Sequence, residues 1–258
     1  MTDPMLLHPG RPSVVGHRGA SADAPQNTLA AFRLALAEGA DGIETDLRLT
    51  ADGAPAVIHD ARVDATTDGR GLVADLTLAQ VRALDAGTSF DARFAGQRVP
   101  TLDDLVTLLA DHPTTELLLE LKGVWAASEV APVVRALQDA DVAGRVVVKG
   151  FRRETVEAVR TAAPGVRRGL LVEHPTPDLL DACARLDVWT CNPAVALVAA
   201  DPGLVAALHD AGHHVMVWDA DTPEEWELCT ALGVDAIMTD HPGALARWFD
   251  ARAEGARA

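Results

Sequence analysis

The sequence predicts an α/β fold, a (β/α)8 TIM barrel with a hairpin and an inserted segment after the second barrel strand. Eight short runs of nearly continuous apolar residues alternate with eight helical stretches, and such runs are typical of parallel strands that helices cover. No linker interrupts the alternation over 258 residues, and barrels of this kind run to about 250 residues as one domain. An open, doubly wound sheet is the alternative, because the number of repeats alone does not close a sheet.

The expected elements follow one another along the whole chain. Strands are expected at Ser13–Gly16, Gly42–Leu47, Glu116–Leu121, Val146–Gly150, Arg168–Val172, Val188–Asn192, His214–Asp219 and Ala236–Thr239. Helices are expected at Asn27–Glu38, Leu102–Asp111, Ser128–Asp139, Arg153–Ala163, Pro177–Arg185, Leu204–Ala211, Pro223–Leu232 and Gly243–Ala251. Helix starts carry capping residues or proline: Thr222 precedes Pro223, and Glu225 follows three residues after the threonine.

One segment breaks the alternation after the second strand. The pair Asp52–Gly53 is a strong turn signal and is followed by the apolar run Pro55–Ile58, which predicts a hairpin that extends beyond the barrel. From about Asp60 to Pro100 the periodicity is weak. We therefore expect a single domain over residues 1–258 with an insertion at about 60–100. Because loops after barrel strands carry function, the insertion is a candidate substrate lid.

Composition excludes several classes of partner. The chain carries 22 Lys and Arg against 38 Asp and Glu, a net charge of −16, whereas nucleic acids and anionic membrane surfaces bind basic faces. No apolar run approaches the roughly 18 residues of a membrane span, so we expect no stable membrane insertion, and the first twelve residues do not resemble a secretory signal. Three cysteines without a CxxC spacing indicate neither a disulfide framework nor a zinc site. These observations predict a cytoplasmic protein, and no pattern predicts an oligomeric state.

Carboxylates stand at the ends of two predicted strands, where barrel active sites form. Glu44 and Asp46 lie two apart on one strand, so their side chains point to the same face. Glu120 ends the next barrel strand and supplies a third carboxylate. Like charges that face one another at low dielectric need a cation or a proton between them. Three carboxylates suit a hard ion, Mg²⁺ or Ca²⁺, better than zinc; a solvated surface pair is the alternative for Glu44 and Asp46.

Histidines and cations occupy other strand ends. The hairpin sets His59 across from Glu44 or Asp46, with Cβ atoms about 5 Å apart, and His17 with Arg18 follows the first strand. Lys122 comes two residues after Glu120, so both side chains point to the same face. The chain has only two lysines, and the second, Lys149, either reaches the site or pairs with a helix carboxylate. Trp218 either stacks on a ligand or plugs the barrel rim.

Four stretches of these residues, in order and with the same spacing, resemble the glycerophosphodiester phosphodiesterase family over about residues 13–246. The stretches are Gly16–Gly19 with Pro25–Thr28, Ile43–Asp46 with Asp52–Gly53 and His59–Asp60, Leu119–Lys122, and Val217–Trp218 with Gly233–Asp240. The ordered combination is specific, although each stretch alone is weak.

The resemblance implies a role for each matching residue. It implies a metal held by Glu44, Asp46 and Glu120, His17 and His59 as an acid–base pair, Arg18 and Lys122 as phosphate-binding groups, and a TIM barrel with an insertion after His59. Two positions depart from the family pattern. Gln26 stands where the family usually has glutamate, and Ala65 stands where it usually has arginine before Thr66–Thr67.

The expected function is metal-dependent hydrolysis of a small-molecule glycerophosphodiester to glycerol 3-phosphate and an alcohol, with Trp218 as a further substrate contact. Either water or the neighbouring glycerol hydroxyl can serve as the nucleophile, and the latter would leave a cyclic phosphate. The alternatives are a lysophospholipase D-like or other phosphodiesterase on the same site, and a non-catalytic phosphodiester-binding protein, which the two departures motivate.

Overall fold

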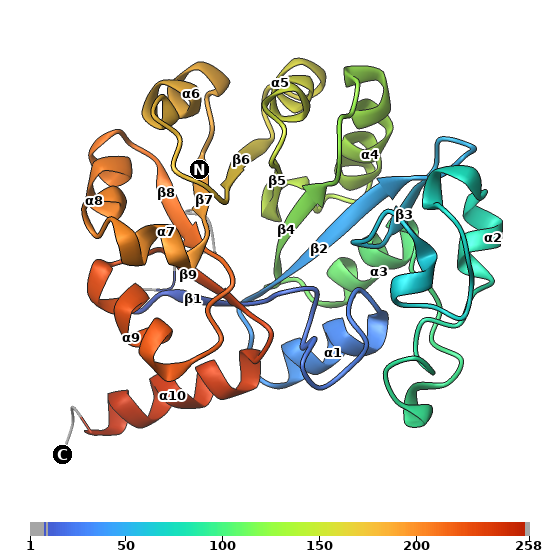
Figure 1. Ribbon diagram of the computed structural model, residues 1–258, viewed down its shortest axis with the longest axis horizontal. Helices are drawn as coiled ribbons and strands as arrows, with labels where there is room; N and C mark the ends of the chain where they lie inside the picture. Colours follow the sequence, from blue (N-terminus) through green and yellow to red (C-terminus); the bar gives the residue numbers. More distant parts are fainter. Residues whose placement is uncertain (1–7, 9, 256–258) are drawn as a thin grey trace.

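In the computed structural model, which describes His8 and residues 10–255, eight parallel strands close into a barrel inside a ring of helices (Figure 1). The strands are β1 (Ser13–Gly16), β2 (Gly42–Leu49), β4 (Glu116–Leu121), β5 (Val146–Gly150), β6 (Arg167–Val172), β7 (Thr190–Pro193), β8 (His214–Val217) and β9 (Ala236–Thr239). Closure comes from β1, which pairs with β9 on one side and with β2 on the other. The barrel prediction is confirmed, and the open sheet is excluded.

Ten helices lie within the described residues, together with four short 3₁₀ turns. The helices are α1 (Leu29–Ala37), α2 (Leu78–Arg82), α3 (Leu102–Asp111), α4 (Ala127–Asp139), α5 (Arg153–Ala162), α6 (Leu179–Leu186), α7 (Val195–Ala200), α8 (Gly203–Asp210), α9 (Pro223–Leu232) and α10 (Pro242–Gly255). The eight expected helices are present with boundary shifts of up to four residues. The largest is at the end of α10; at α1, Thr28 caps the first turn, so the helix begins at Leu29 rather than Asn27.

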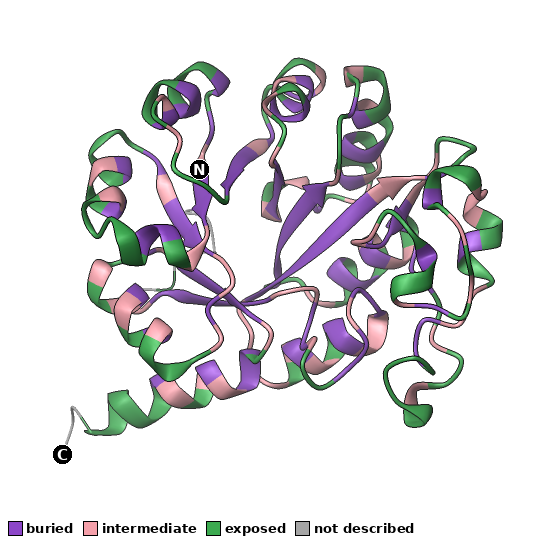
Figure 2. Cartoon of the chain, viewed as in Figure 1, coloured by how far each residue is buried: buried purple, intermediate pink, exposed green. Residues whose placement is uncertain are grey.

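Apolar packing forms one layer inside the barrel and a second layer between strands and helices. Inside, a small cluster centres on Val15, Leu118, Val147 and Met216. Outside, larger clusters join the strands to the inner faces of the helices. Figure 2 shows this arrangement as buried strands ringed by helices with exposed outer faces. The polar carboxyl ends of the strands therefore lie on a closely packed base, which suits a site that needs fixed geometry.

The expected hairpin is present and leads into the inserted segment. The strand β3 (Pro55–Val57) pairs antiparallel with β2, Leu47 facing Val57. The segment that follows holds α2 and the 3₁₀ turns Val63–Ala65, Val73–Asp75 and Ala92–Phe94, and it packs on a small apolar cluster of its own beside the barrel (Figure 1). It is thus more ordered than its weak periodicity predicted, because short helical turns leave little periodic signal.

Candidate functional site

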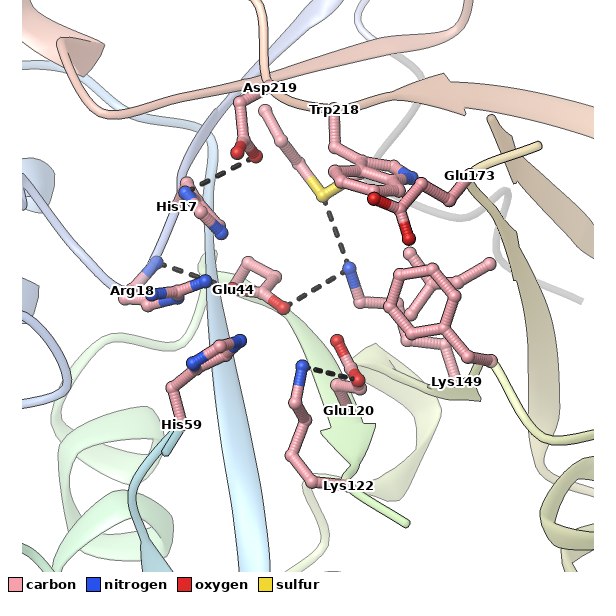
Figure 3. A pocket seen from close by; sticks show the side chains of 13 residues that line it. His17, Arg18, Glu44, His59, Glu120, Lys122, Lys149, Glu173, Trp218 and Asp219 are labelled. Atoms are coloured by element: carbon pink, nitrogen blue, oxygen red, sulfur yellow. Dashed lines mark hydrogen bonds and ion pairs between the residues drawn. The ribbon is translucent and has the colours of Figure 1, made fainter. Parts of the chain in front are cut away.

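A pocket of about 280 Å³ opens at the carboxyl ends of the strands, and we call it the mouth pocket. Its lining residues are His17, Arg18, Glu44, His59, Glu120, Lys122, Lys149, Phe151, Leu171, Glu173, Trp218, Asp219 and Met238. Figure 3 shows the labelled side chains pointing toward one another from several strands and from the loops that follow them. Seven of the eight residues selected from the sequence line it, and the eighth, Asp46, lies buried beside it. The inserted segment contributes none of the residues that line this pocket.

The three candidate metal ligands meet as the strand register requires. In the parallel ladder Asp46 faces Glu120, and Glu44 precedes Asp46 by two residues on the same strand. One oxygen from each carboxylate lies within 4.8 Å of the others. All three side chains are buried, so the solvated-pair interpretation is wrong. Burial, followed by the charge of Asp46, raises the pKa of Glu120 to about 7, a sign of excess negative charge that a cation would relieve.

Asp46 is held by an asparagine that the sequence did not single out as functional. The Asn27 side-chain amide donates to Asp46 Oδ2 at 2.8 Å, and its oxygen accepts from the Thr45 hydroxyl at 2.6 Å. Asn27 itself has φ of 56°, a left-handed conformation that asparagine tolerates better than most residues. The loop after β1 therefore fixes the orientation of a β2 carboxylate.

Two cations face the carboxylates from the rim of the pocket. Lys122 Nζ lies 2.8 Å from Glu120 Oε1 and 3.5 Å from Asp46 Oδ1, and Arg18 Nε lies 3.4 Å from Asp46 Oδ2. Although burial favours protonation of Asp46, the charges of Lys122 and Arg18 outweigh burial and lower its pKa. Gln26 accepts a hydrogen bond from Arg18 Nη1 at 2.5 Å. Residue 26 thus acts on the arginine side chain.

His17 is oriented by carboxylates that follow β8 and β9. Its Nδ1 lies 2.7 Å from Asp240 Oδ1 and 3.3 Å from Asp219 Oδ1, and the Ser21 hydroxyl donates to the same Asp240 oxygen at 2.7 Å. Burial lowers the pKa of His17, but the Asp240 hydrogen bond, with Glu44 and Asp219, outweighs burial and leaves the pKa raised. Because Nδ1 is engaged by Asp240, Nε2 is the ring nitrogen left for chemistry.

His59 lines the mouth pocket, but its position relative to β2 differs from the predicted one. The β2–β3 ladder ends at Leu47 and Val57, and Ile58 donates its N–H to the Asp46 carbonyl at 3.0 Å. His59 therefore lies one residue beyond the position opposite Asp46, and the expected direct pairing across the hairpin is wrong. Burial, with the charges of Arg18 and Lys122, outweighs Asp46 and Asp60 and lowers the pKa of His59. The two histidines are thus shifted in opposite directions.

Aromatic side chains form one wall of the pocket. Trp218 is half-buried; its Nε1–H donates to the Asn192 carbonyl at 2.7 Å, and its ring meets Phe151 edge to face with centroids 5.4 Å apart. The indole therefore lies at the rim and also lines the pocket, where its ring is available to a ligand. Phe151 and Glu173 were not found from the sequence, because each follows its strand in a loop with no distinctive spacing.

These features define a class of protein: a barrel enzyme of the phosphoric diester hydrolase kind, with carboxylates, histidines and cations around one small pocket. The model of the glycerophosphoryl diester phosphodiesterase family matches residues 17–244. A glycerophosphodiester phosphodiesterase of Caldanaerobacter subterraneus is 35% identical over 234 residues, which cover 90% of this chain and 95% of the relative. The chain therefore belongs to the glycerophosphoryl diester phosphodiesterase family.

Solved structures agree with this assignment. A phosphodiesterase of Oleispira antarctica, in complex with the product sn-glycerol-3-phosphate, superposes with a TM-score of 0.86 at 26% identity and covers 93% of this chain and 97% of its own. A glycerophosphodiester phosphodiesterase of Agrobacterium tumefaciens gives 0.79 at 32% identity, with 92% and 99% covered. Among the described residues, no helix combines the length and apolar character needed to cross a membrane.

Proposed function

We propose that the chain hydrolyses glycerophosphodiesters to glycerol 3-phosphate and an alcohol with the help of one divalent cation, Mg²⁺ or Ca²⁺. The observation that carries the proposal is the convergence of three buried carboxylates, two histidines and two rim cations on one pocket of about 280 Å³. A phosphodiester fits this set because it needs charge neutralisation, a proton acceptor and a proton donor within one enclosure. The solved relative that holds sn-glycerol-3-phosphate supports the expected product.

The donor set fits a divalent ion. Glu44, Asp46 and Glu120 offer hard oxygen atoms within 4.8 Å of one another, as Mg²⁺ and Ca²⁺ prefer. Burial and the charge of Asp46 raise the pKa of Glu120 to about 7, so a nearby cation would favour its charged, metal-binding form. When bound, a divalent ion supplies positive charge to the phosphate oxygens during P–O cleavage.

We assign the two histidines to opposite proton transfers. His17 carries the carboxylates Asp240 and Asp219 on its Nδ1 side, which favour its protonated form, so it suits the general acid that protonates the departing alkoxide. Burial, together with the cations Arg18 and Lys122, lowers the pKa of His59 and favours its neutral form, so it suits the general base that activates the nucleophile. Paired roles of this kind contribute typically 10² to 10⁴-fold each.

Phosphate binding falls to the rim cations, with Trp218 beside them as a substrate contact. Arg18 Nε is buried and makes no hydrogen bond within the described residues, although it lies 3.4 Å from Asp46 Oδ2, so its N–H can turn to an incoming phosphate oxygen. Arg18 offers a planar, bidentate fork, whereas Lys122 acts as a compact point charge. Lys122 contacts carboxylates at 2.8 and 3.5 Å and would share its charge with the substrate.

A turnover assay on glycerophosphocholine tests the proposal. Glycerol 3-phosphate and choline are measured after EDTA treatment and again after addition of MgCl2 or CaCl2. Activity that disappears in EDTA and returns with either ion supports the proposal, full activity after exhaustive chelation contradicts the metal role, and no turnover under any condition indicates a binding protein. A cyclic phosphate detected early in the reaction would identify the glycerol hydroxyl as nucleophile; its absence under single turnover would favour water.

A lysophospholipid is a second candidate substrate, because two further cavities extend in succession from the mouth pocket and the outer one is apolar. The inner cavity, of about 560 Å³, shares Phe151 and Glu173 with the mouth pocket and is also lined by charged side chains such as Arg152. It also shares Val172 and Leu179 with an apolar cavity of about 860 Å³. An acyl chain leaving the active site could follow this path. Lysophosphatidylcholine turned over faster than glycerophosphocholine would favour this substrate.

We also propose a single domain and a cytoplasmic location. Apart from its own small cluster, the inserted segment joins the barrel through β3, which is part of the same sheet, and this supports one domain with an insertion. All three cysteines are buried and free, which suits a reducing compartment. Limited proteolysis that released a stable fragment at residues 60–100 would contradict the single domain.

A further inference from the structure

Lys149 is a buried lysine with a partner inside the barrel. It stands near the end of β5, its side chain is 1% exposed, and its Nζ lies 3.2 Å from Glu44 Oε1. The same nitrogen lies 3.2 Å from the sulfur of Met238. Lysine is almost never fully buried unless it is paired. The ion pair with a candidate metal ligand, rather than with a helix carboxylate, therefore explains why a lysine is accommodated here.

The neighbouring strand leaves room for this side chain. In the β5–β6 ladder Lys149 faces Gly169. A Cβ atom at position 169 would lie 3.0 Å from Lys149 Cβ and 2.8 Å from Asn192 Oδ1, both closer than well-packed atoms allow. Glycine at this position thus lets the lysine stem cross the barrel interior toward Glu44.

Each carboxylate of the cluster has a cation, but the cations differ in their freedom to move. Lys122 and Arg18 lie in loops at the rim, 11% and 19% exposed, and can turn toward a phosphate. Lys149 belongs to a strand and its side chain is only 1% exposed, although it borders the mouth pocket, so it cannot leave Glu44 without taking a buried charge away from its partner. Its ammonium group is therefore held beside Glu44.

We propose that Lys149 is a built-in counter-ion of the carboxylate cluster, which holds Glu44 in place when no metal is bound and lowers the affinity of the cluster for a divalent cation. The proposal rests on the metal site put forward above. Two consequences follow from electrostatics. Without an ion, the lysine stabilises the fold by neutralising Glu44; with an ion, the lysine repels it and competes for the same carboxylate.

The test measures stability and ion binding rather than turnover. K149Q keeps a hydrogen-bond donor for Glu44 but removes the charge. In EDTA, its Tm should fall by several degrees. Calorimetric titration of the chelated and dialysed protein with MgCl2 or CaCl2 should show a Kd about tenfold lower than in the parent, and saturating ion should recover most of the lost Tm. A Kd in K149Q that is unchanged or higher would overturn the proposal.

A matched control separates a charge effect from general loss of packing. Arg168 lies on β6, is 4% exposed like Lys149, and pairs with Asp187 and the Leu186 carbonyl instead of the cluster. R168Q should lower the Tm and leave the Kd within about twofold of the parent. An equal gain in ion affinity in R168Q would also overturn the proposal, because the gain would then not depend on the cluster.

Two further outcomes keep the test decisive. If K149Q does not fold, the double variant E44Q/K149M removes both partners and should fold, because no buried charge is left unpaired; a double variant that also fails to fold would overturn the pairing. If the parent protein binds neither ion, the proposed metal site fails, and the role of Lys149 fails with it. If the parent protein binds the ion and K149Q binds it with the same Kd, the metal site stands and only the proposed role of Lys149 is overturned.

Discussion

Replacing Asp240 by asparagine tests the assignment of His17 as the general acid. The variant keeps the size of the side chain but removes the negative charge 2.7 Å from His17 Nδ1. A hydrogen bond to a charged group contributes about 1.5–3 kcal/mol. The Asp240 side chain is 38% exposed, so water screens its charge and the lower end, about 1.5 kcal/mol, applies. That energy corresponds to roughly one pKa unit.

The direction of the change follows from the raised pKa of His17. A general acid works in its protonated form, so activity falls as the pH rises through its pKa. Asp240→Asn lowers this pKa, and the alkaline limb of the kcat profile should move about one unit toward lower pH. We expect kcat to fall between about tenfold and hundredfold, since Asp219, 3.3 Å away, still favours the imidazolium.

Asp235, which lies at the other end of β9 from Asp240, offers a control. Asp235 precedes β9 and contacts His209 at 2.8 Å and His214 at 3.1 Å, so it repeats the carboxylate–histidine contact away from the mouth pocket. Asp235→Asn should lower the Tm and leave the pH profile unchanged. An unmoved alkaline limb in Asp240→Asn, or an equal shift in both variants, would refute the acid role of His17.

Three further substitutions test other parts of the site. His59→Ala deletes the proposed base, so kcat should fall by roughly 10² or more and the acidic limb of the pH profile should disappear. The Tm should change little, because the side chain is partly exposed. Near-parental turnover would show that His59 has only a structural role. Asn27→Ala removes two hydrogen bonds that orient Asp46. We expect the Tm to fall by several degrees and Mg²⁺ binding, measured by calorimetry, to weaken severalfold. Unchanged binding would show that Asp46 needs no such support. Gln26→Glu should pair with Arg18 and raise KM severalfold while kcat stays within about tenfold, measured by steady-state kinetics; an unchanged KM would exclude Arg18 from phosphate binding.

The parts of the site that the sequence predicted follow from two rules of strand geometry: side chains alternate along a strand, and the carboxyl ends of parallel strands meet at one edge. Side chains two residues apart on a strand point to the same face, so Glu44 and Asp46 could be paired without knowledge of the fold. Glu120 followed because the carboxyl ends of neighbouring parallel strands meet. The position of His59 was predicted less well, because the exact end of a short ladder depends on packing that a turn signal does not report.

The parts that the sequence did not predict depend on contacts across the closed barrel. His17 and Asp240 lie 223 residues apart, and they meet only because β1 pairs with β9. Asp240 directly follows the expected strand Ala236–Thr239, but nothing local pairs it with a histidine. The helix α7 was missed for a different reason. Its sequence, Val195–Ala200, is short and apolar throughout, and a run of that kind gives no helical period.

The two departures from the family pattern meet in one place. Gln26 and Ala65 line the same small cavity of about 140 Å³, together with Pro25 and Phe90. A family member with glutamate and arginine at these positions would bring opposite charges to one cavity, so the chain lacks both members of a potential pair and the net charge near Arg18 is preserved. Gln26→Glu alone adds an unbalanced negative charge, which explains the expected rise in KM. Adding Ala65→Arg should then return KM toward the parental value, because the new carboxylate gains a partner other than Arg18. A double variant whose KM equals that of Gln26→Glu would show that the two positions act independently.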